Sequence, residues 1–197
     1  MQLKKELLTC NLQLETCSGG THIAKDDNGR KRDILTMIRE RRSIRMYKKK
    51  APSEEEIERV LEAGRWAPSG LNNQPWRFLV IKSKAKKDGL ASFTQYGNII
   101  KGAPVVIVVC MDVADSYNRD KDLMAVGACI QNMLLQAHSM GLGACWLGEI
   151  TNRKQDVHAY LKLHQDLELM SVVTLGYSDE GVTEGCRKTL KNLLIEP

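Results

Sequence analysis

The apolar residues of this chain repeat at helical spacing in two stretches before residue 70. The first predicts a short amphipathic helix after Asp33, and its apolar positions are Ile34, Leu35, Met37 and Ile38. The second predicts a longer helix whose buried face holds Ile57, Val60, Leu61 and Gly64. Ser53 and Glu56 have the spacing of a capping box at the start of this helix, and Pro68 predicts its end near Trp66.

Further along the chain the apolar residues form runs that predict strands, at residues 77–82, 104–111 and 170–176. The second of these runs is continuous and rich in β-branched residues, which is typical of a strand covered on both faces. Residues 123–140 are apolar almost all round and predict a buried central helix, which Gly141 ends. A strand or turn is expected at 143–148.

Two polar stretches complete the pattern. Residues 112–122, which include Tyr117, are interpreted as a mobile surface segment. Asn152 and Gln155 repeat the capping-box spacing and predict a further helix that runs through Leu161.

Residues 1–32 differ from the rest of the chain. Residues 18–20 and 25–32 are polar and rich in turn-forming residues, so this part is interpreted as a linker-like extension without an assigned role. A length of 197 residues fits one domain, or one domain with an appendage. The expected organisation is therefore an N-terminal extension of residues 1–32 and one domain of residues 33–197.

Composition narrows the classes of function. The 43% apolar and 27% charged residues are ordinary for a soluble protein. No apolar run reaches the roughly 18 residues needed to span a bilayer, and the first residues lack the pattern of a signal peptide. The net charge of +5 is modest and aromatic residues make up 5%, so a basic face with stacking rings for nucleic acid is not expected.

The six cysteines include no C-x-x-C pair. In the absence of an export signal, we expect reduced thiols in the cytoplasm rather than disulfides. Cys10, Cys17 and His22 lack a fourth ligand and a common metal-site spacing, so no metal site is predicted.

A basic motif, Arg41-Arg42-Ser43-Ile44-Arg45, follows the first predicted helix. Arginine presents a planar fork of donors that binds a phosphate monoester through two bonds at a time. The alternative is a charged helix end, because cations are favourable at the C-terminus of a helix. The density of arginines, with Ser43 between them, favours the phosphate.

A polar turn, residues 67–76 with the sequence APSGLNNQPW, follows the second predicted helix. Amide side chains offer a donor and an acceptor together, which suits the edge of a heterocycle that carries C=O and N–H groups. Gly70 would free the backbone for close approach to a ligand. An ordinary polar turn is the alternative. A phosphate motif and a heterocycle motif on one chain indicate a mononucleotide.

Together the two motifs resemble the FMN-dependent nitroreductase family, and the resemblance runs from about Asp33 to the C-terminus. Residues 141–148, GLGACWLG, are similar to the family's GLGxxWxG stretch. No G-x-G-x-x-G follows a strand, which argues against a Rossmann domain. The resemblance implies an α+β fold with a mixed sheet flanked by helices, in an interlocked homodimer with FMN between the subunits. The apolar helix and the leucine-rich tail 190–194 are consistent with a large interface.

The resemblance also implies a set of cofactor-binding residues. The FMN phosphate would be held by Arg41, Arg42, Ser43 and Arg45, with Arg187 returning to it from the C-terminal segment and Lys188 as the alternative. The turn would contribute Pro68, Ser69, Gly70, Asn72 and Gln74, of which Asn72 and Gln74 read the ring or the ribityl hydroxyls. Trp146, Leu147 and Gly148 would bring backbone N–H groups close to flavin N5.

No side chain is assigned a catalytic role, because the cofactor carries the chemistry and flavin N5 carries the hydride. The resemblance implies an oxidoreductase that passes a hydride from NAD(P)H to an electron-poor acceptor such as a nitroaromatic or a quinone. One shared site for both partners predicts ping-pong kinetics. Two alternatives stay open: another flavin chemistry (flavin fragmentation, dehalogenation or ene reduction), and a non-catalytic flavin-binding module. The sequence does not choose between NADH and NADPH.

Overall fold

The computed structural model describes residues 33–181 and 183–195. The predicted extension 1–32, with Cys10, Cys17 and His22 in it, lies outside the described residues. The helices and strands follow one another as α1 (Ile34–Glu40), α2 (Glu54–Arg65), β1 (Trp76–Ile81), α3 (Lys84–Leu90), α4 (Gly97–Gly102), β2 (Val105–Asp112), α5 (Arg119–Ser139), β3 (Gly143–Leu147), α6 (Lys154–Leu161) and β4 (Leu167–Gly176). Short 3₁₀ turns lie at Gly70–Asn72, Ala91–Phe93, Glu149–Arg153 and Leu190–Leu193.

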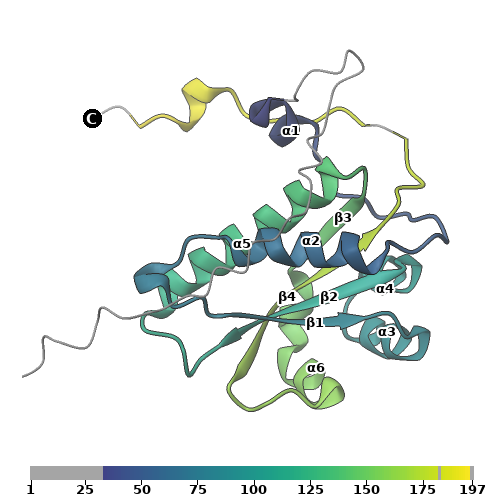
Figure 1. The fold of residues 1–197 in the computed structure, drawn as a ribbon, viewed down its shortest axis with the longest axis vertical. Helices are drawn as coiled ribbons and strands as arrows, with labels where there is room; N and C mark the ends of the chain where they lie inside the picture. Colours follow the sequence, from purple (N-terminus) through teal and green to yellow (C-terminus); the bar gives the residue numbers. More distant parts are fainter. Residues whose placement is uncertain (1–32, 182, 196–197) are drawn as a thin grey trace, which may run out of the picture. The chain divides into compact units, whose positions relative to one another are not determined.

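The four strands form one sheet in the order β1-β2-β4-β3, and each neighbouring pair is antiparallel (Figure 1). Among the described residues the parallel component of the predicted mixed sheet is a single bridge between Ser43 and Ala144. This bridge places the arginine motif along β3. The predicted α+β class is confirmed.

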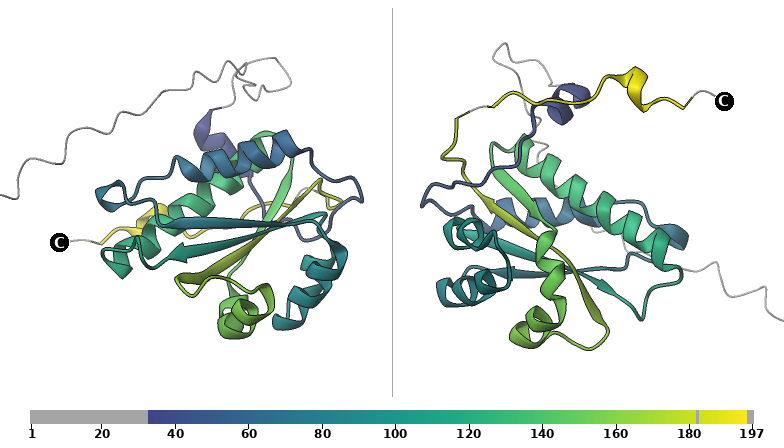
Figure 2. Two further views of the ribbon diagram at one scale, coloured as in Figure 1. Left: turned by 60° about the horizontal axis from the view of Figure 1, so that its bottom comes forward. Right: turned by 180° about the vertical axis from the view of Figure 1, so that it is seen from behind.

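Helices cover both faces of the sheet (Figures 1 and 2). The core on one face packs α2 and α5 against the strands, and the core on the other face packs α3, α4 and α6. Side chains of β2 alternate between the two cores, with Ile107 in the first and Val108 in the second, and both are fully buried. Coverage of both faces is the physical reason for the continuous apolar run in β2.

The predicted start of α2 and the predicted end of α5 are confirmed. The Ser53 hydroxyl accepts a hydrogen bond from the Glu56 N–H at 3.1 Å, and the Glu56 carboxylate accepts one from the Ser53 N–H at 2.7 Å. Gly141 follows α5 with φ +75°, a left-handed conformation that glycine adopts without strain.

Two local predictions are wrong. The helix α5 begins at Arg119 rather than 123, because the Asn118 side chain accepts from the Lys121 N–H at 3.1 Å and caps it. Asn152 does not cap α6, because the 3₁₀ turn Glu149–Arg153 runs directly into the helix and the cap position falls on Arg153, whose side chain makes no capping hydrogen bond.

The first turn of α5 is tied to its neighbours through Glu168 at the start of β4. Arg119 donates to its carboxylate, as does Lys154 of α6 at 2.8 Å. Hydrogen bonds from Arg119, which outweigh the effect of burial, lower the pKa of Glu168 to about 2. Of the helices in the described part of the chain, none has both the length and the apolar character needed to cross a bilayer.

Candidate functional site

The arginine motif lies along β3, next to the start of that strand. The Ile44 N–H donates to the Ala144 carbonyl at 3.0 Å, beside the bridge that Ser43 makes with the same residue. Ile44 packs over Gly143, where an added Cβ would lie 2.7 Å from the Ile44 Cβ. Glycine at this position therefore lets the motif approach the sheet closely enough for the bridge to form.

Arg41, Arg42 and Arg187 bring their guanidiniums into one neighbourhood. Burial lowers the pKa of Arg41, and the positive charges of Arg187 and Arg42 lower it further. Among the described residues, no carboxylate lies within ion-pair distance of these three arginines. Like charges gathered without a counter-ion repel one another, and a bound anion relieves the repulsion. The cluster therefore fits a phosphate group.

Arg42 also anchors the C-terminal segment that carries Arg187. Its Nε donates to the Thr183 carbonyl at 2.9 Å, and its guanidinium lies against Gly185, where an added Cβ would be 2.5 Å from a terminal nitrogen. Another nitrogen donates to the carbonyls of Arg39 and Arg41 at 2.6 and 2.8 Å. Most Arg42 donors are thus engaged with the backbone, whereas the Arg41 guanidinium makes no hydrogen bond to the described residues.

The other two polar residues of the motif are held by their neighbours. The Ser43 side chain lies beside the buried Cys145 thiol, whose pKa is raised mainly by burial. Arg45 donates from its guanidinium to the Ser43 carbonyl at 3.1 Å, and the Arg45 and Met46 N–H groups both donate to the Glu180 carboxylate. Glu180 therefore fixes the backbone of the motif and leaves the exposed Arg45 side chain available.

The polar turn has an unusual backbone. Leu71, Asn72 and Gln74 have φ values of 52°, 55° and 48°, in the left-handed region that non-glycine residues seldom adopt. The Gln74 N–H donates to the Ser69 hydroxyl at 3.0 Å, and the Gln74 side chain donates to the Asn72 carbonyl at 3.1 Å. Ser69 and Gln74 thus support the turn itself, while the side chains of Pro68 and Asn72 are exposed. Strain of this kind concentrates at functional sites.

The predicted close approach at Gly70 exists, but the neighbour in this structure is Tyr117. A Cβ added to Gly70 would lie 1.9 Å from the Tyr117 hydroxyl oxygen and 2.6 Å from two ring carbons. The tyrosine belongs to the stretch 112–122 that was interpreted as a mobile surface segment. Its packing on the turn was not predicted, because a lone aromatic residue in a polar stretch gives no signal of its partner.

Asp122, a second residue that sequence reasoning missed, connects the same elements. It is 0% exposed, and its carboxylate accepts from Asn73 at 2.8 Å, from the Ser116 hydroxyl at 2.6 Å and from the N–H groups of Tyr117 and Asn118 at 3.2 and 3.3 Å. Burial raises the pKa of Asp122, but these hydrogen bonds outweigh it and lower the pKa below its usual value. Most of residues 112–122 are exposed, as predicted for a surface segment, and two of their backbone N–H groups donate to this buried carboxylate. The mobility of the segment stays a prediction.

The predicted segment at the end of β3 lies beside α5. The Trp146 side chain is 42% exposed and reaches Gly127 of α5, 3.8 Å from a Cβ added there, whereas Leu147 is buried. Gly148 is exposed, and its carbonyl accepts from the N–H and the hydroxyl of Thr151 at 3.1 and 2.8 Å.

Strand register places the two motifs at opposite corners of the sheet. The polar turn leads into Trp76 at the start of β1, which pairs with Met111 near the end of β2. The arginine motif bridges Ala144 of β3, which pairs with Leu175, and Leu175 pairs with Val105 at the start of β2. The motifs are thus separated both along the strands and across the sheet.

The helix α5 gives the size of this separation. Asp122 in its first turn bonds to the polar turn, and His138 in its last turn lies 3.9 Å from Glu40, next to the arginine motif. His138 lies sixteen positions after Asp122, which corresponds to about 24 Å at the rise of an α-helix. Figure 1 shows α1 at one end of α5 and the loop into β1 at the other. One chain therefore does not bring its two motifs together.

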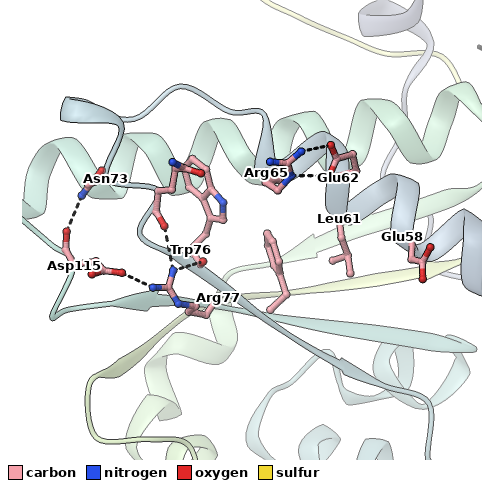
Figure 3. A pocket seen from close by; sticks show the side chains of 10 residues that line it. Glu58, Leu61, Glu62, Arg65, Asn73, Trp76, Arg77 and Asp115 are labelled. Atoms are coloured by element: carbon pink, nitrogen blue, oxygen red, sulfur yellow. Dashed lines mark hydrogen bonds and ion pairs between the residues drawn. The ribbon is translucent and has the colours of Figure 1, made fainter. Parts of the chain in front are cut away.

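A cavity of about 580 Å³ opens between α2 and β1, next to the polar turn (Figure 3). Its floor is apolar, with Leu61, Trp76 and Phe78, and charged side chains surround it. Among them Arg77 pairs with Asp115 and, at 3.0 Å, with Asp112. No residue of the arginine motif lines this cavity, so it does not join the two corners of the sheet.

Comparison with known proteins decides the family. The sequence model of the nitroreductase family matches residues 38–97 and 92–177, which is most of the chain. The chain belongs to the nitroreductase family. A candidate nitroreductase of Desulfovibrio desulfuricans, crystallised in complex with FMN, is 45% identical to this chain and superimposes with a TM-score of 0.81 over 84% of this chain and 97% of that one.

Two relatives show the range of the nitroreductase family. A candidate NADH dehydrogenase/NAD(P)H nitroreductase of Methanothermobacter thermautotrophicus is 34% identical over 152 residues, 76% of this chain and 80% of that protein. The iodotyrosine deiodinase of Thermotoga neapolitana is 25% identical over 172 residues, 75% of this chain and 89% of that protein. The match of the family model to this chain includes both motifs and residues 146–148, but it ends at 177, before Arg187.

Proposed function

We propose that this protein binds FMN and passes a hydride from NAD(P)H to an electron-poor acceptor such as a nitroaromatic or a quinone. As a family member it is an NAD(P)H-dependent flavoenzyme of the nitroreductase type. The observation that carries the proposal is the cluster of Arg41, Arg42 and Arg187 without a carboxylate partner among the described residues. FMN held at these residues would supply the hydride chemistry, with NAD(P)H as the electron donor.

At the phosphate end, Arg41 and Arg187 would donate to the phosphate oxygens, and Ser43 and Arg45 would complete the site. Two guanidiniums balance the charge of a phosphate monoester and bind it in a planar, bidentate way. Arg42 would contribute positive charge to the phosphate site. It would also hold the C-terminal segment that carries Arg187 in place. The proximity of Arg187 to Arg41 favours Arg187 over Lys188 as the residue that returns to the phosphate.

At the ring end, the polar turn would present Asn72 and Gln74 to the flavin ring or the ribityl hydroxyls, on a backbone shaped by Pro68, Ser69 and Gly70. The exposed amide of Asn72 has donors and an acceptor available. Trp146, Leu147 and Gly148 would line the ring beside α5. Backbone N–H donors near the ring would stabilise the negative charge that develops on reduction. NAD(P)H and the electron acceptor would bind at this one site one after the other, so the kinetics would be ping-pong.

The separation of the motifs supports a homodimer in which each FMN lies between subunits. A distance of about 24 Å along α5 is longer than the ribityl phosphate chain that joins the phosphate to the ring. A second copy would bring its polar turn to the arginine motif of the first. Several exposed apolar side chains are available for such an interface: Leu123 and Met124 in α5, Trp146 beside α5, and Leu190, Leu193, Leu194 and Ile195 in the tail.

Mixing two defective variants tests this shared site. We expect Arg41→Ala/Arg187→Ala and Asn72→Ala/Gln74→Ala each to lose FMN binding, through opposite ends of the site. When the two variants are unfolded and refolded together in equal amounts, about half of the dimers contain one subunit of each variant. Each mixed dimer has one intact site and one doubly defective site, so about a quarter of all FMN sites should recover. FMN bound per subunit, measured after gel filtration, reports the result. No recovery, with dimers present, would mean that one chain supplies both ends.

The visible spectrum tests the function itself. Purified protein, or protein given FMN, is expected to show oxidised-flavin bands that bleach when NADPH or NADH is added without oxygen and return when 1,4-naphthoquinone follows. A colourless protein that takes up no FMN would contradict the cofactor assignment. Bands that NAD(P)H does not bleach would favour a non-catalytic flavin-binding module.

Reductive dehalogenation is the second candidate, and the similarity to an iodotyrosine deiodinase favours it among the other flavin chemistries. Release of iodide from iodotyrosine, measured beside quinone reduction, separates the two. We also propose a cytoplasmic location, since Cys110, Cys129 and Cys145 are buried free thiols in the described part of the chain.

A further inference from the structure

Tyr117 lies directly on the polar turn that would read the flavin. Its hydroxyl oxygen and two ring carbons lie against Gly70, so close that any side chain at that position would displace the ring. The residue is 41% exposed, and its hydroxyl makes no hydrogen bond to the described residues. An exposed phenol with an unused O–H donor thus stands beside the proposed ring site.

The surrounding residues hold Tyr117 in this position. Its backbone N–H donates to the buried Asp122 carboxylate at 3.2 Å, and Asn73 of the turn donates both to Asp122 at 2.8 Å and to the Asp115 carbonyl at 3.0 Å. Turn and tyrosine are therefore fixed to the same carboxylate.

The positive charge of Lys121 lies beside the Tyr117 ring and would stabilise an acceptor that becomes negatively charged as it gains electrons. The Lys121 Nζ lies 5.4 Å from the centre of the Tyr117 ring. Nitro and quinone oxygens accept hydrogen bonds, and those bonds strengthen as negative charge develops on the oxygens during reduction. The Tyr117 hydroxyl as a donor, with the positive charge of Lys121 nearby, would therefore favour the reduction of nitro and quinone groups.

We propose that Tyr117 selects the electron acceptor, by donating a hydrogen bond from its hydroxyl to an oxygen of the nitroaromatic or quinone that stacks on the flavin. This role rests on the proposed function and deepens it, because it names a residue that recognises the second substrate. NAD(P)H oxidation and FMN binding would not depend on the Tyr117 hydroxyl.

The Tyr117→Phe variant tests the assignment, with Tyr160→Phe as a matched control. Tyr160 is 38% exposed and lies on α6, outside the proposed site. In Tyr117→Phe we expect kcat/KM for 1,4-naphthoquinone and nitrobenzene to fall about tenfold, as loss of one hydrogen bond predicts. Reduction of ferricyanide, which takes electrons without a hydrogen bond, should stay unchanged, as should the FMN Kd and the rate of bleaching by NAD(P)H.

Binding without turnover gives an independent readout. Oxidised protein titrated with nitrobenzene, with no NAD(P)H present, should change its flavin absorbance with a Kd about tenfold higher in Tyr117→Phe than in the wild type or Tyr160→Phe. Equal losses for ferricyanide and naphthoquinone, or no loss for either, would overturn the selection role while the flavin function stands. Failure of the wild type to bind FMN or to be bleached would overturn the proposed function and this role with it.

Discussion

Arg41→Ala combined with Arg187→Ala is expected to raise the Kd for FMN at least about 100-fold. Each guanidinium would make charge-assisted hydrogen bonds to the phosphate, worth about 1.5–3 kcal/mol, and about 1.4 kcal/mol corresponds to tenfold in affinity. Titration of the apoprotein with FMN, followed by the quenching of flavin fluorescence, measures the change.

The stability of the apoprotein distinguishes a binding role from a structural role. Arg41 is repelled by Arg187 and Arg42 and has no ion pair among the described residues, so its removal should leave the Tm of the apoprotein unchanged or raise it. Arg153→Ala removes an exposed arginine that pairs with Asp156 on α6, and it should leave the FMN affinity unchanged. A lower Tm for the double variant, together with unchanged FMN affinity, would mean that these arginines support the fold and do not bind phosphate.

Asp122→Asn is expected to lower the free energy of unfolding by about 3 kcal/mol at pH 7, because it replaces a buried acceptor that serves four donors with a group that carries two hydrogens of its own. The Asn73 amide, the Ser116 hydroxyl and two backbone N–H groups then compete for one remaining oxygen. Urea unfolding of both proteins measures the difference. Asp156→Asn on α6, an exposed partner of Arg153, is the matched control and should change the free energy of unfolding by less than about 1 kcal/mol.

The difference between Asp122→Asn and the wild type should depend on pH. The pKa of Asp122 is lower in the folded protein than the unfolded value of about 3.9, so the unfolded chain binds the proton more readily. The stabilisation is therefore complete above the unfolded pKa and disappears as pH falls through the folded pKa. Unfolding curves from pH 7 down to pH 3 should converge for the two proteins. A constant difference would mean that folding does not change the pKa of Asp122.

Local signals in the sequence predicted most elements correctly. The continuous apolar run at 104–111 predicted a strand covered on both faces, because only such a position buries every side chain. The capping box at Ser53 and Glu56 predicted the start of α2, because both partners lie within one turn. The predicted capping box at Asn152 is wrong, since a 3₁₀ turn leads directly into α6 there. No local pattern in the sequence predicts that the turn and the helix are continuous.

The sequence by itself determined the family, and it supplied the residue types of the proposed cofactor site, because the RRSxR and APSGxNxQPW motifs are contiguous and their chemistry is local. Only the tertiary structure decided that these motifs stand at opposite corners of one sheet, that the C-terminal segment brings Arg187 beside Arg41, and that Tyr117 and Asp122 belong with the polar turn. These relations join residues distant along the chain through strand register and a buried carboxylate. Such contacts form only when the folded chain packs its core and pairs its buried polar groups at the same time. The sequence does not predict them, because no short stretch contains both partners of a contact.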